Sequence, residues 1–153
     1  MANTYTQIYM QFVFAVKNRE SLIQADWKDE LYRYITGIIQ EHHHKLLAIN
    51  GTSNHIHIFI GYKPHQLIRD LLQDIKASSS AWINKKNLVK GKFSWQQGYG
   101  AFSYSKSHID RVVKYIMNQE QHHKKMTFKE EYIEFLDKFG VGYDVKYFPE
   151  DIK

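Results

Sequence analysis

One stretch decides the fold: Asn54-His55-Ile56-His57-Ile58-Phe59-Ile60-Gly61. Successive side chains of a β-strand point to opposite faces, so the two histidines share one face with Phe59 and the three isoleucines share the other. The isoleucine face is suited to burial against a helix. The two histidines lie roughly 6–7 Å apart at Cα, so their imidazoles can converge on one ion or one phosphate. The same pattern also fits half-exposed polar residues on an amphipathic strand, without any ligand.

The composition is that of one folded domain. The chain has 153 residues, of which 43% are hydrophobic, and only two prolines, which favours a globule with its own core over a disordered chain. The absence of cysteine excludes disulfides and thiolate zinc sites. No apolar run approaches the ~20 residues of a membrane span, and the N-terminus lacks the pattern of a signal peptide. We therefore expect a single cytoplasmic domain over residues 1–153.

A basic segment rich in aromatic residues occupies the middle of the chain. Residues 75–109 contain no Asp or Glu, although the whole chain carries a net charge of only +5. Lysines neutralise phosphates and aromatic faces stack on unpaired bases, so this composition predicts a surface for single-stranded nucleic acid. The alternative is a solvated loop whose aromatic residues belong to the core. The candidate DNA-binding residues of this segment are Lys85, Lys86, Lys90, Lys92 and Trp95.

Alternating polar and apolar residues predict four strands. The first covers residues 4–17, the second and third form a hairpin over residues 45–50 and 54–61, and the fourth covers residues 100–105. With a helix after the first strand and another after the third, the order matches the split βαβ arrangement. The predicted fold class is therefore α+β and ferredoxin-like, an antiparallel sheet with helices packed on one face and further helices at the C-terminus.

Apolar residues at three-to-four spacing predict the helices. The first is expected to be capped by Asp26, the second to begin at Pro64, and the third to cover residues 107–124. Thr127 and Glu130 predict a capping box for the last helix, which Gly140 would end; the tail, residues 141–153, is expected to pack on another surface.

The third predicted helix carries a polar stripe beside its apolar one. Tyr115 and Gln119 are one turn apart on this stripe and project together. Arg111 and His122 fall on the same stripe. A hydroxyl nucleophile, an amide oxygen able to bind a metal and an arginine on one face suit phosphoryl chemistry. A tyrosine at the rim of an apolar stripe is also a common core residue, so both interpretations stay open.

These motifs together resemble a known family. The pair His55-Ile56-His57 followed by Tyr115-x-x-x-Gln119 is similar to the single-tyrosine HUH transposases of the insertion-sequence 200/605 family, also called IS200-like. The likeness runs through nearly the whole chain. Members of that family have a ferredoxin-like domain, act as dimers and recombine single-stranded DNA at hairpins near the ends of their element. This chain departs from the pattern at Ser53-Asn54, where many relatives place Pro-Asp, so it has one carboxylate fewer near the ion.

The resemblance implies roles for individual residues. It makes His55, His57 and Gln119 the ligands of Mg²⁺ or Mn²⁺. It makes Tyr115 the nucleophile, which would form a 5′-phosphotyrosine and release a 3′-OH. No nucleotide cofactor is implied, because the phosphotyrosine keeps the bond energy needed for rejoining. No membrane is expected either, because the chain has no apolar run of the necessary length. We further expect a homodimer whose active sites are shared between chains.

Arg111 and His122 would contact the phosphate of the substrate if the resemblance holds. Two other functions fit the same sequence. A ferredoxin-like sheet with stacking aromatic residues is also similar to an RNA-recognition domain, which would bind nucleic acid without a metal and without Tyr115. A domesticated or repeat-associated relative of the family would cut DNA without mobilising an element. A metal-dependent covalent adduct with DNA separates the first alternative from a transposase.

Overall fold

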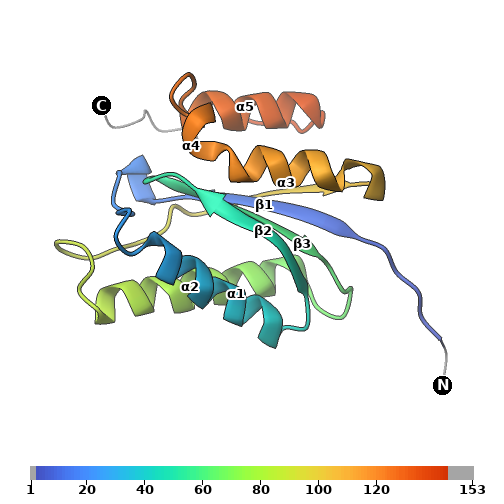
Figure 1. Cartoon of the computed structure of the whole chain (residues 1–153), viewed down its shortest axis with the longest axis horizontal. Coiled ribbons are helices and arrows are strands. Elements are labelled where there is room, and N and C mark those ends of the chain that lie inside the picture. The colour runs from blue at the N-terminus through green and yellow to red at the C-terminus, as the bar shows by residue number, and fades with distance from the viewer. Residues whose placement is uncertain (1–2, 145–153) are drawn as a thin grey trace.

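In a computed structural model of the chain, which describes residues 3–144, one four-stranded antiparallel sheet lies between two layers of helices (Figure 1). The strands are β1 (Tyr9–Ala15), β2 (Lys45–Gly51), β3 (His55–Gly61) and β4 (Gly100–Tyr104), in the spatial order β2-β3-β1-β4. The predicted α+β, ferredoxin-like arrangement is confirmed. Among the described residues, no helix has the length and apolar content needed to cross a membrane.

The helices α1 (Lys28–Glu41) and α2 (Ile68–Lys85) cover one face of the sheet (Figure 1). The isoleucine face of β3 and the apolar face of β1 supply the sheet side of the main core, which contains Phe12, Phe14, Ile56, Ile58 and Ile60. Burial of these large side chains is the main favourable contribution to folding. The face assignment made for the third strand is therefore confirmed.

Both helices of this layer begin later than predicted. The cap residue of α1 is Trp27 rather than Asp26, and it makes no side-chain cap hydrogen bond. The helix α2 begins at Ile68 rather than Pro64, because Leu67 keeps an extended backbone (φ −79°, ψ 141°). The preceding turn is fixed by Gln66, whose side chain bonds His42 (3.1 Å) and His44 (2.7 Å) at the end of α1.

The helices α3 (Ile109–Met117), α4 (Gln119–His122) and α5 (Phe128–Lys138) cover the other face (Figure 1). The prediction of one continuous helix over residues 107–124 is wrong, because the chain leaves helical geometry at Asn118 (φ −100°, ψ 18°). From β2, Asn50 Nδ2 donates to the carbonyls of Ile116 (3.0 Å) and Met117 (3.2 Å), which satisfies the end of α3. The break leaves Gln119 fully buried against the sheet.

The last helix has the predicted boundaries. Thr127 accepts from the backbone of Glu130, and Glu130 accepts from the backbone of Thr127, so the capping box is present. Gly140 has a positive φ of 67°, and Val141 N donates to Leu136 O (2.9 Å), an arrangement that ends helices. The expected packing of the tail concerns residues 145–153 for the most part, and these lie outside the described residues.

The face under α3, α4 and α5 has two small apolar clusters in place of one core. In the first, Phe128 and Leu136 of α5 pack on Val13, Ala15 and Phe102 of the sheet. In the second, Val112 and Ile116 of α3 pack on Ala48 and Phe59 of the sheet. Buried polar side chains from β1 and β3, Gln11, His55 and His57, lie on the same face of the sheet as both clusters. The fold therefore leaves a polar seam between α3 and α5.

Candidate active site

The two histidines of β3 are buried at this seam. Both side chains are 0% exposed, and their ring centroids are 5.2 Å apart. Gln11 Nε2 of the neighbouring strand donates to His57 Nδ1 (2.9 Å), and the Tyr104 hydroxyl donates to Gln11 Oε1 (2.8 Å). The alternative of half-exposed histidines on an amphipathic strand is excluded. Two adjacent buried imidazoles require polar partners, and the helices supply them.

Both ring nitrogens of His55 face an amide oxygen, which can only accept a hydrogen bond. Nδ1 lies 2.7 Å from Asn54 Oδ1, and a neutral ring can donate from only one of its two nitrogens. Burial first, and the neighbouring His57 second, lower the pKa of His55 well below its usual value, so the ring is neutral at pH 7. Nε2 then faces Gln119 Oε1 at 2.9 Å. A lone pair opposite an oxygen is the arrangement that a cation would satisfy.

The departure at Asn54 therefore has a structural role. Its amide oxygen contacts His55 Nδ1 (2.7 Å), as a carboxylate could, but it brings no negative charge.

Glu131 on α5 is the site residue that sequence analysis missed. It is 1% exposed, and its Oε1 lies 2.9 Å from His57 Nε2 and 3.1 Å from His123 Nε2. Burial acts to raise the pKa of Glu131, but the adjacent imidazoles of His123 and His57 outweigh it and hold the pKa well below its usual value. The carboxylate is thus ionised at neutral pH. One signal was available: Glu131 interrupts the apolar stripe between Phe128 and Phe135.

Tyr115 points into the same cluster from α3. Its hydroxyl donates to Glu131 Oε2 and lies 3.2 Å from His122 Nε2. Gln119 Nε2 also donates to Glu131 Oε2 (3.0 Å). Burial, followed by the charge of Glu131, raises the pKa of Tyr115 well above its usual value, so the hydroxyl keeps its proton in this state. One chain thus brings together the four residues that the sequence singled out, Tyr115, Gln119, His55 and His57.

The donor set fits a divalent metal ion. His55, His57 and Glu131 place ligand atoms within 4.8 Å of one another, as do His122, His123 and Glu131. Imidazole nitrogens with one carboxylate are a common ligand set for divalent metals. His123 Nε2 is buried and makes no hydrogen bond, although it lies near Glu131. This orphaned nitrogen is a second feature that a bound cation would explain.

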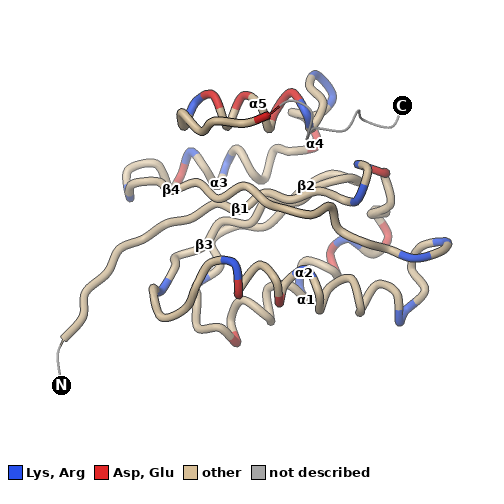
Figure 2. Tube along the Cα trace, turned by 180° about the vertical axis from the view of Figure 1, so that it is seen from behind, with Lys and Arg blue, Asp and Glu red and all other residues tan. Residues whose placement is uncertain are grey.

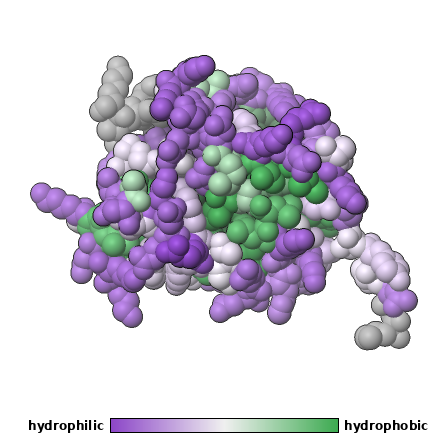
Figure 3. Space-filling view, viewed as in Figure 1, coloured by the Kyte–Doolittle hydropathy of each residue, from purple (hydrophilic) through white to green (hydrophobic). Residues whose placement is uncertain are grey.

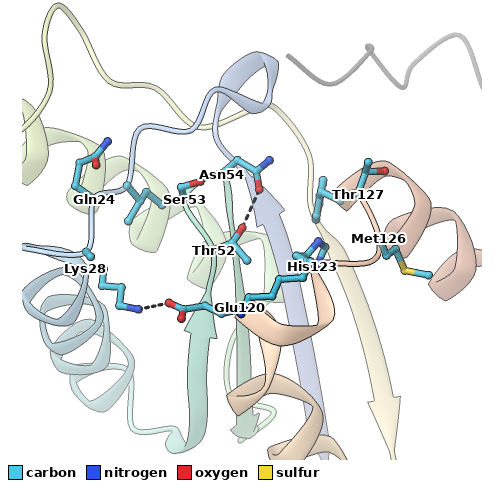
Figure 4. A pocket seen from close by; sticks show the side chains of 13 residues that line it. Gln24, Lys28, Thr52, Ser53, Asn54, Glu120, His123, Met126 and Thr127 are labelled. Atoms are coloured by element: carbon cyan, nitrogen blue, oxygen red, sulfur yellow. Dashed lines mark hydrogen bonds and ion pairs between the residues drawn. The ribbon is translucent and has the colours of Figure 1, made fainter. Parts of the chain in front are cut away.

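Two cavities flank the cluster. One, of about 350 Å³, is lined by Tyr115, Arg111 and His122 among others. Tyr115 and the two residues predicted to contact the phosphate, Arg111 and His122, therefore line the same cavity. The other, of about 490 Å³, lies on the His123 side, between the turn that links β2 to β3, the start of α1 and the turn before α5 (Figure 4). The cluster therefore has open space on both sides.

The predicted basic surface lies elsewhere. Lys85, Lys86, Lys90 and Lys92 are all exposed, at the end of α2 and in the loop that follows it (Figure 2). Lys86 pairs with Glu30 (2.7 Å). None of the four lines the cavity that contains Tyr115. The structure thus separates these lysines from the tyrosine, whereas Arg111 and His122 lie beside it.

The expectation that Trp95 offers a face to an unpaired base is wrong. The side chain is 8% exposed, and its indole Nε1 donates to Ser79 Oγ (2.9 Å). Edge contacts with Phe14 (4.8 Å) and Phe93 (4.9 Å) hold the ring in the main core. Trp95 therefore packs beneath the basic loop as a core residue, which was the alternative left open for the aromatic residues of this segment.

Comparison with known proteins agrees with this geometry. The chain is 22% identical to the ISDra2 transposase TnpA of Deinococcus radiodurans over 124 residues, 78% of this chain and 87% of the relative. It shares its fold with a Deinococcus radiodurans R1 protein of known crystal structure (TM-score 0.62, 20% identity, 78% of this chain and 96% of the other). It also shares its fold with a REP-associated tyrosine transposase bound to a REP hairpin (TM-score 0.62, 16% identity, 100% and 98%).

The sequence profile of the family described as "Transposase IS200 like" matches residues 4–119. This match spans both histidines of β3, Tyr115 and Gln119, and it stops short of His122, His123 and Glu131. The chain belongs to the IS200-like transposase family.

Proposed function

We propose that this transposase cleaves and rejoins single-stranded DNA through a 5′-phosphotyrosine on Tyr115, in a reaction that depends on a divalent metal ion. One observation carries the proposal: in a chain of this family, the hydroxyl of Tyr115 and the imidazoles of His55 and His57 meet at a single buried carboxylate. The whole chain, residues 1–153, would act as one domain in the cytoplasm.

In the proposed cleavage step, Tyr115 Oη attacks the phosphorus of the scissile phosphodiester. The bond from phosphorus to the 3′ oxygen breaks, and that oxygen leaves as a 3′-OH. Glu131 Oε2 already accepts the hydrogen bond of the hydroxyl, so it is placed to take the tyrosine proton and pass it to the leaving oxygen. Rejoining reverses these steps: a 3′-OH attacks the phosphotyrosine, the new phosphodiester forms and Tyr115 regains its proton.

His55, His57 and Gln119 would hold the ion, Mg²⁺ or Mn²⁺. A bound divalent ion supplies Lewis-acid polarisation of the scissile phosphate. Among the residues of the chain, Asn54 contacts the ring of His55 at Nδ1 (2.7 Å). Gln119 faces His55 Nε2 and donates to Glu131, which accepts the hydrogen bond of Tyr115.

Arg111 and His122 support binding of the DNA backbone, since both line the cavity of Tyr115. We propose single-stranded DNA with a hairpin as the substrate, because a structural neighbour is a transposase bound to a REP hairpin. That neighbour is REP-associated and aligns with the whole chain. This favours a second candidate function of the same chemistry, in which a repeat-associated enzyme cuts DNA without mobilising an element.

We propose a homodimer that forms through the edge of the sheet at β2. This strand is an outer strand, and it carries the part-buried residues Leu46, Leu47 and Ile49. Figure 3 shows apolar side chains gathered on the face where β2 lies between α1 and α3, and Met117 on α3 is 58% exposed. Exposed apolar surface beside an unpaired strand edge is typical of an association site.

The shared active site expected from the sequence can be tested by mixing. A His55→Ala/His57→Ala variant and a Tyr115→Phe variant, each inactive alone, regain cleavage on subunit exchange only if a tyrosine serves the partner's histidines. Because α3 packs on β2 and β3 of its own chain, we propose that each chain uses its own Tyr115 and expect no recovery. Recovery of cleavage would establish the shared arrangement.

The test of the proposed function uses single-stranded DNA that contains a hairpin from the sequence flanking the gene. Incubation with Mn²⁺ should give a cleaved strand and a covalent protein–DNA band. A chelator, His55→Ala and His57→Ala should each remove both products. Cleavage that survives the chelator would contradict metal dependence, and hairpin binding without any adduct would favour a non-catalytic nucleic-acid-binding module.

A further inference from the structure

We infer that His123 and Glu131 are metal ligands of this chain, and that they complete a site of three imidazoles and one carboxylate around the His55–His57 pair. The inference rests on the proposed metal dependence and extends it to two residues beyond the segment that matches the family profile. Glu131 would then supply the negative charge that many relatives have at the position of Asn54.

The first observation is that three imidazole nitrogens surround one carboxylate oxygen. Glu131 Oε1 lies 2.9 Å from His57 Nε2, 3.1 Å from His123 Nε2 and 3.5 Å from His55 Nε2. The rings of His55 and His123 are in contact, with centroids 4.4 Å apart. Three imidazole nitrogens around one carboxylate oxygen, drawn from separate segments of the chain, form a ready-made set of ligand atoms.

The second observation is the state of His123. Its side chain is only 10% exposed, and its buried Nε2 lies 3.1 Å from Glu131 Oε1 in a geometry that makes no hydrogen bond. A buried imidazole nitrogen without a partner is costly unless another ligand satisfies it. The neighbouring His122 differs, because its Nε2 lies 3.2 Å from the Tyr115 hydroxyl and its side chain is 30% exposed. Position 123, and not 122, is therefore directed at the His55–His57 pair.

The third observation is a route for the ion. The cavity of about 490 Å³ is lined by the exposed residues Gln24 and Thr127 and also by His123, so it connects the surface with the cluster (Figure 4). A buried metal site needs such an entry path. Asn54 lines the same cavity and contacts His55 Nδ1 (2.7 Å), so the cavity also adjoins a residue that holds the ring of His55.

A site of this composition predicts a preference among metals. Three imidazoles favour Mn²⁺, and more strongly Co²⁺ and Zn²⁺, over Mg²⁺, whereas a site of oxygen ligands favours Mg²⁺. The single negative charge of Glu131 would raise the affinity for every divalent ion relative to a neutral ligand set.

The experiment is calorimetric titration of the full-length protein with Mn²⁺, without DNA. His123→Gln and Glu131→Gln are compared with wild type, and His122→Gln serves as the matched control. We expect both test variants to bind Mn²⁺ at least about tenfold more weakly and His122→Gln to bind like wild type. The visible absorption of bound Co²⁺ should change in His123→Gln, and the circular dichroism and melting temperature of each variant establish that it is folded.

The outcomes separate this inference from the proposed function. Mn²⁺ binding that needs His55 and His57 but is unchanged in His123→Gln and Glu131→Gln overturns the inference and leaves metal-dependent cleavage intact. A loss in His122→Gln equal to that in His123→Gln overturns it too, because the ion would then lie with His122. A wild-type protein that binds no Mn²⁺ overturns both.

Discussion

The two faces of the sheet are built from the same strands and differ in almost every other respect. Toward α1 and α2, β1 and β3 present Phe12, Phe14 and the isoleucines, which form one continuous apolar core. Toward α3, α4 and α5, the same strands present Gln11, His55 and His57 between two small apolar clusters. Because side chains alternate along a strand, β3 contributes to both faces. We call the face of the sheet toward α1 and α2 the stabilising face, and the face toward α3, α4 and α5, which carries His55 and His57, the chemical face.

Ile58→Ala tests the stabilising face and should have the largest effect on stability. Removing a fully buried side chain leaves a cavity in the main core, which costs about 2–5 kcal/mol of unfolding free energy. Urea denaturation measures this loss. Because Ile58 points away from the seam, the folded fraction should still form the DNA adduct in the cold. A loss below about 1 kcal/mol would mean that this face is not the main source of stability.

Lowering the pH probes the chemical face. The pKa of His55 is depressed in the folded chain, so below its unfolded value of 6.5 the unfolded chain binds a proton that the folded chain does not. Above pH 6.5, the contribution of the neutral His55 ring to the unfolding free energy is fully present. Below pH 6.5, the unfolding free energy falls by up to about 1.4 kcal/mol per pH unit. A second loss of the same sign follows below pH 4.5, where unfolded Glu131 binds a proton.

Urea titrations from pH 7.5 to pH 5 measure this dependence, and His55→Gln should flatten it. The pKa of His44 is also lowered by burial, so His44→Gln is the control for the share that comes from the end of α1. An unchanged slope in His55→Gln would show that His55 is not held neutral at the seam.

Thr127→Ala sharpens the comparison within the chemical face. The capping box holds the start of α5, which carries Glu131 one turn later. Loss of the cap should cost about 1 kcal/mol of unfolding free energy. A Thr127→Ser variant keeps a hydroxyl at the cap position and should retain most of this stabilisation. Thermal unfolding of the two variants gives the difference. Equal stability of Thr127→Ala and wild type would show that the cap does not secure this helix.

The smallest effect should come from the surface on the α2 side. Replacing Lys85, Lys90 and Lys92 by Gln should weaken DNA binding and reduce the slope of log affinity against log salt by roughly 0.7 for each phosphate that the protein no longer neutralises. Lys86 is left in place, since it is engaged with Glu30. Arg111→Gln, in the cavity of Tyr115, is the comparison. If only Arg111→Gln changes the slope, DNA does not extend to the α2 loop.

Sequence patterns predicted the stabilising face well and the chemical face in part. The alternation in β1 and β3 and the helical spacing of α1 and α2 are local signals, and they sufficed for the sheet order. The break at Asn118 depends on Asn50, 68 positions earlier in the chain, so no local pattern marks it. Glu131 belongs to the site only because α5 folds back over β1 and β4. Trp95 was misassigned because the composition of a segment does not show whether an aromatic ring is exposed for base stacking or buried in the core.

We propose above all that Tyr115 is the nucleophile of a metal-dependent active site. The most direct test is to trap the covalent adduct with hairpin-containing single-stranded DNA and Mn²⁺, digest it, and identify the modified peptide by mass spectrometry. We predict a nucleotide phosphate on Tyr115 alone, and no adduct in Tyr115→Phe, which keeps the ring and its packing. An adduct on Tyr104 or Tyr132, or one that persists in Tyr115→Phe, would contradict this assignment.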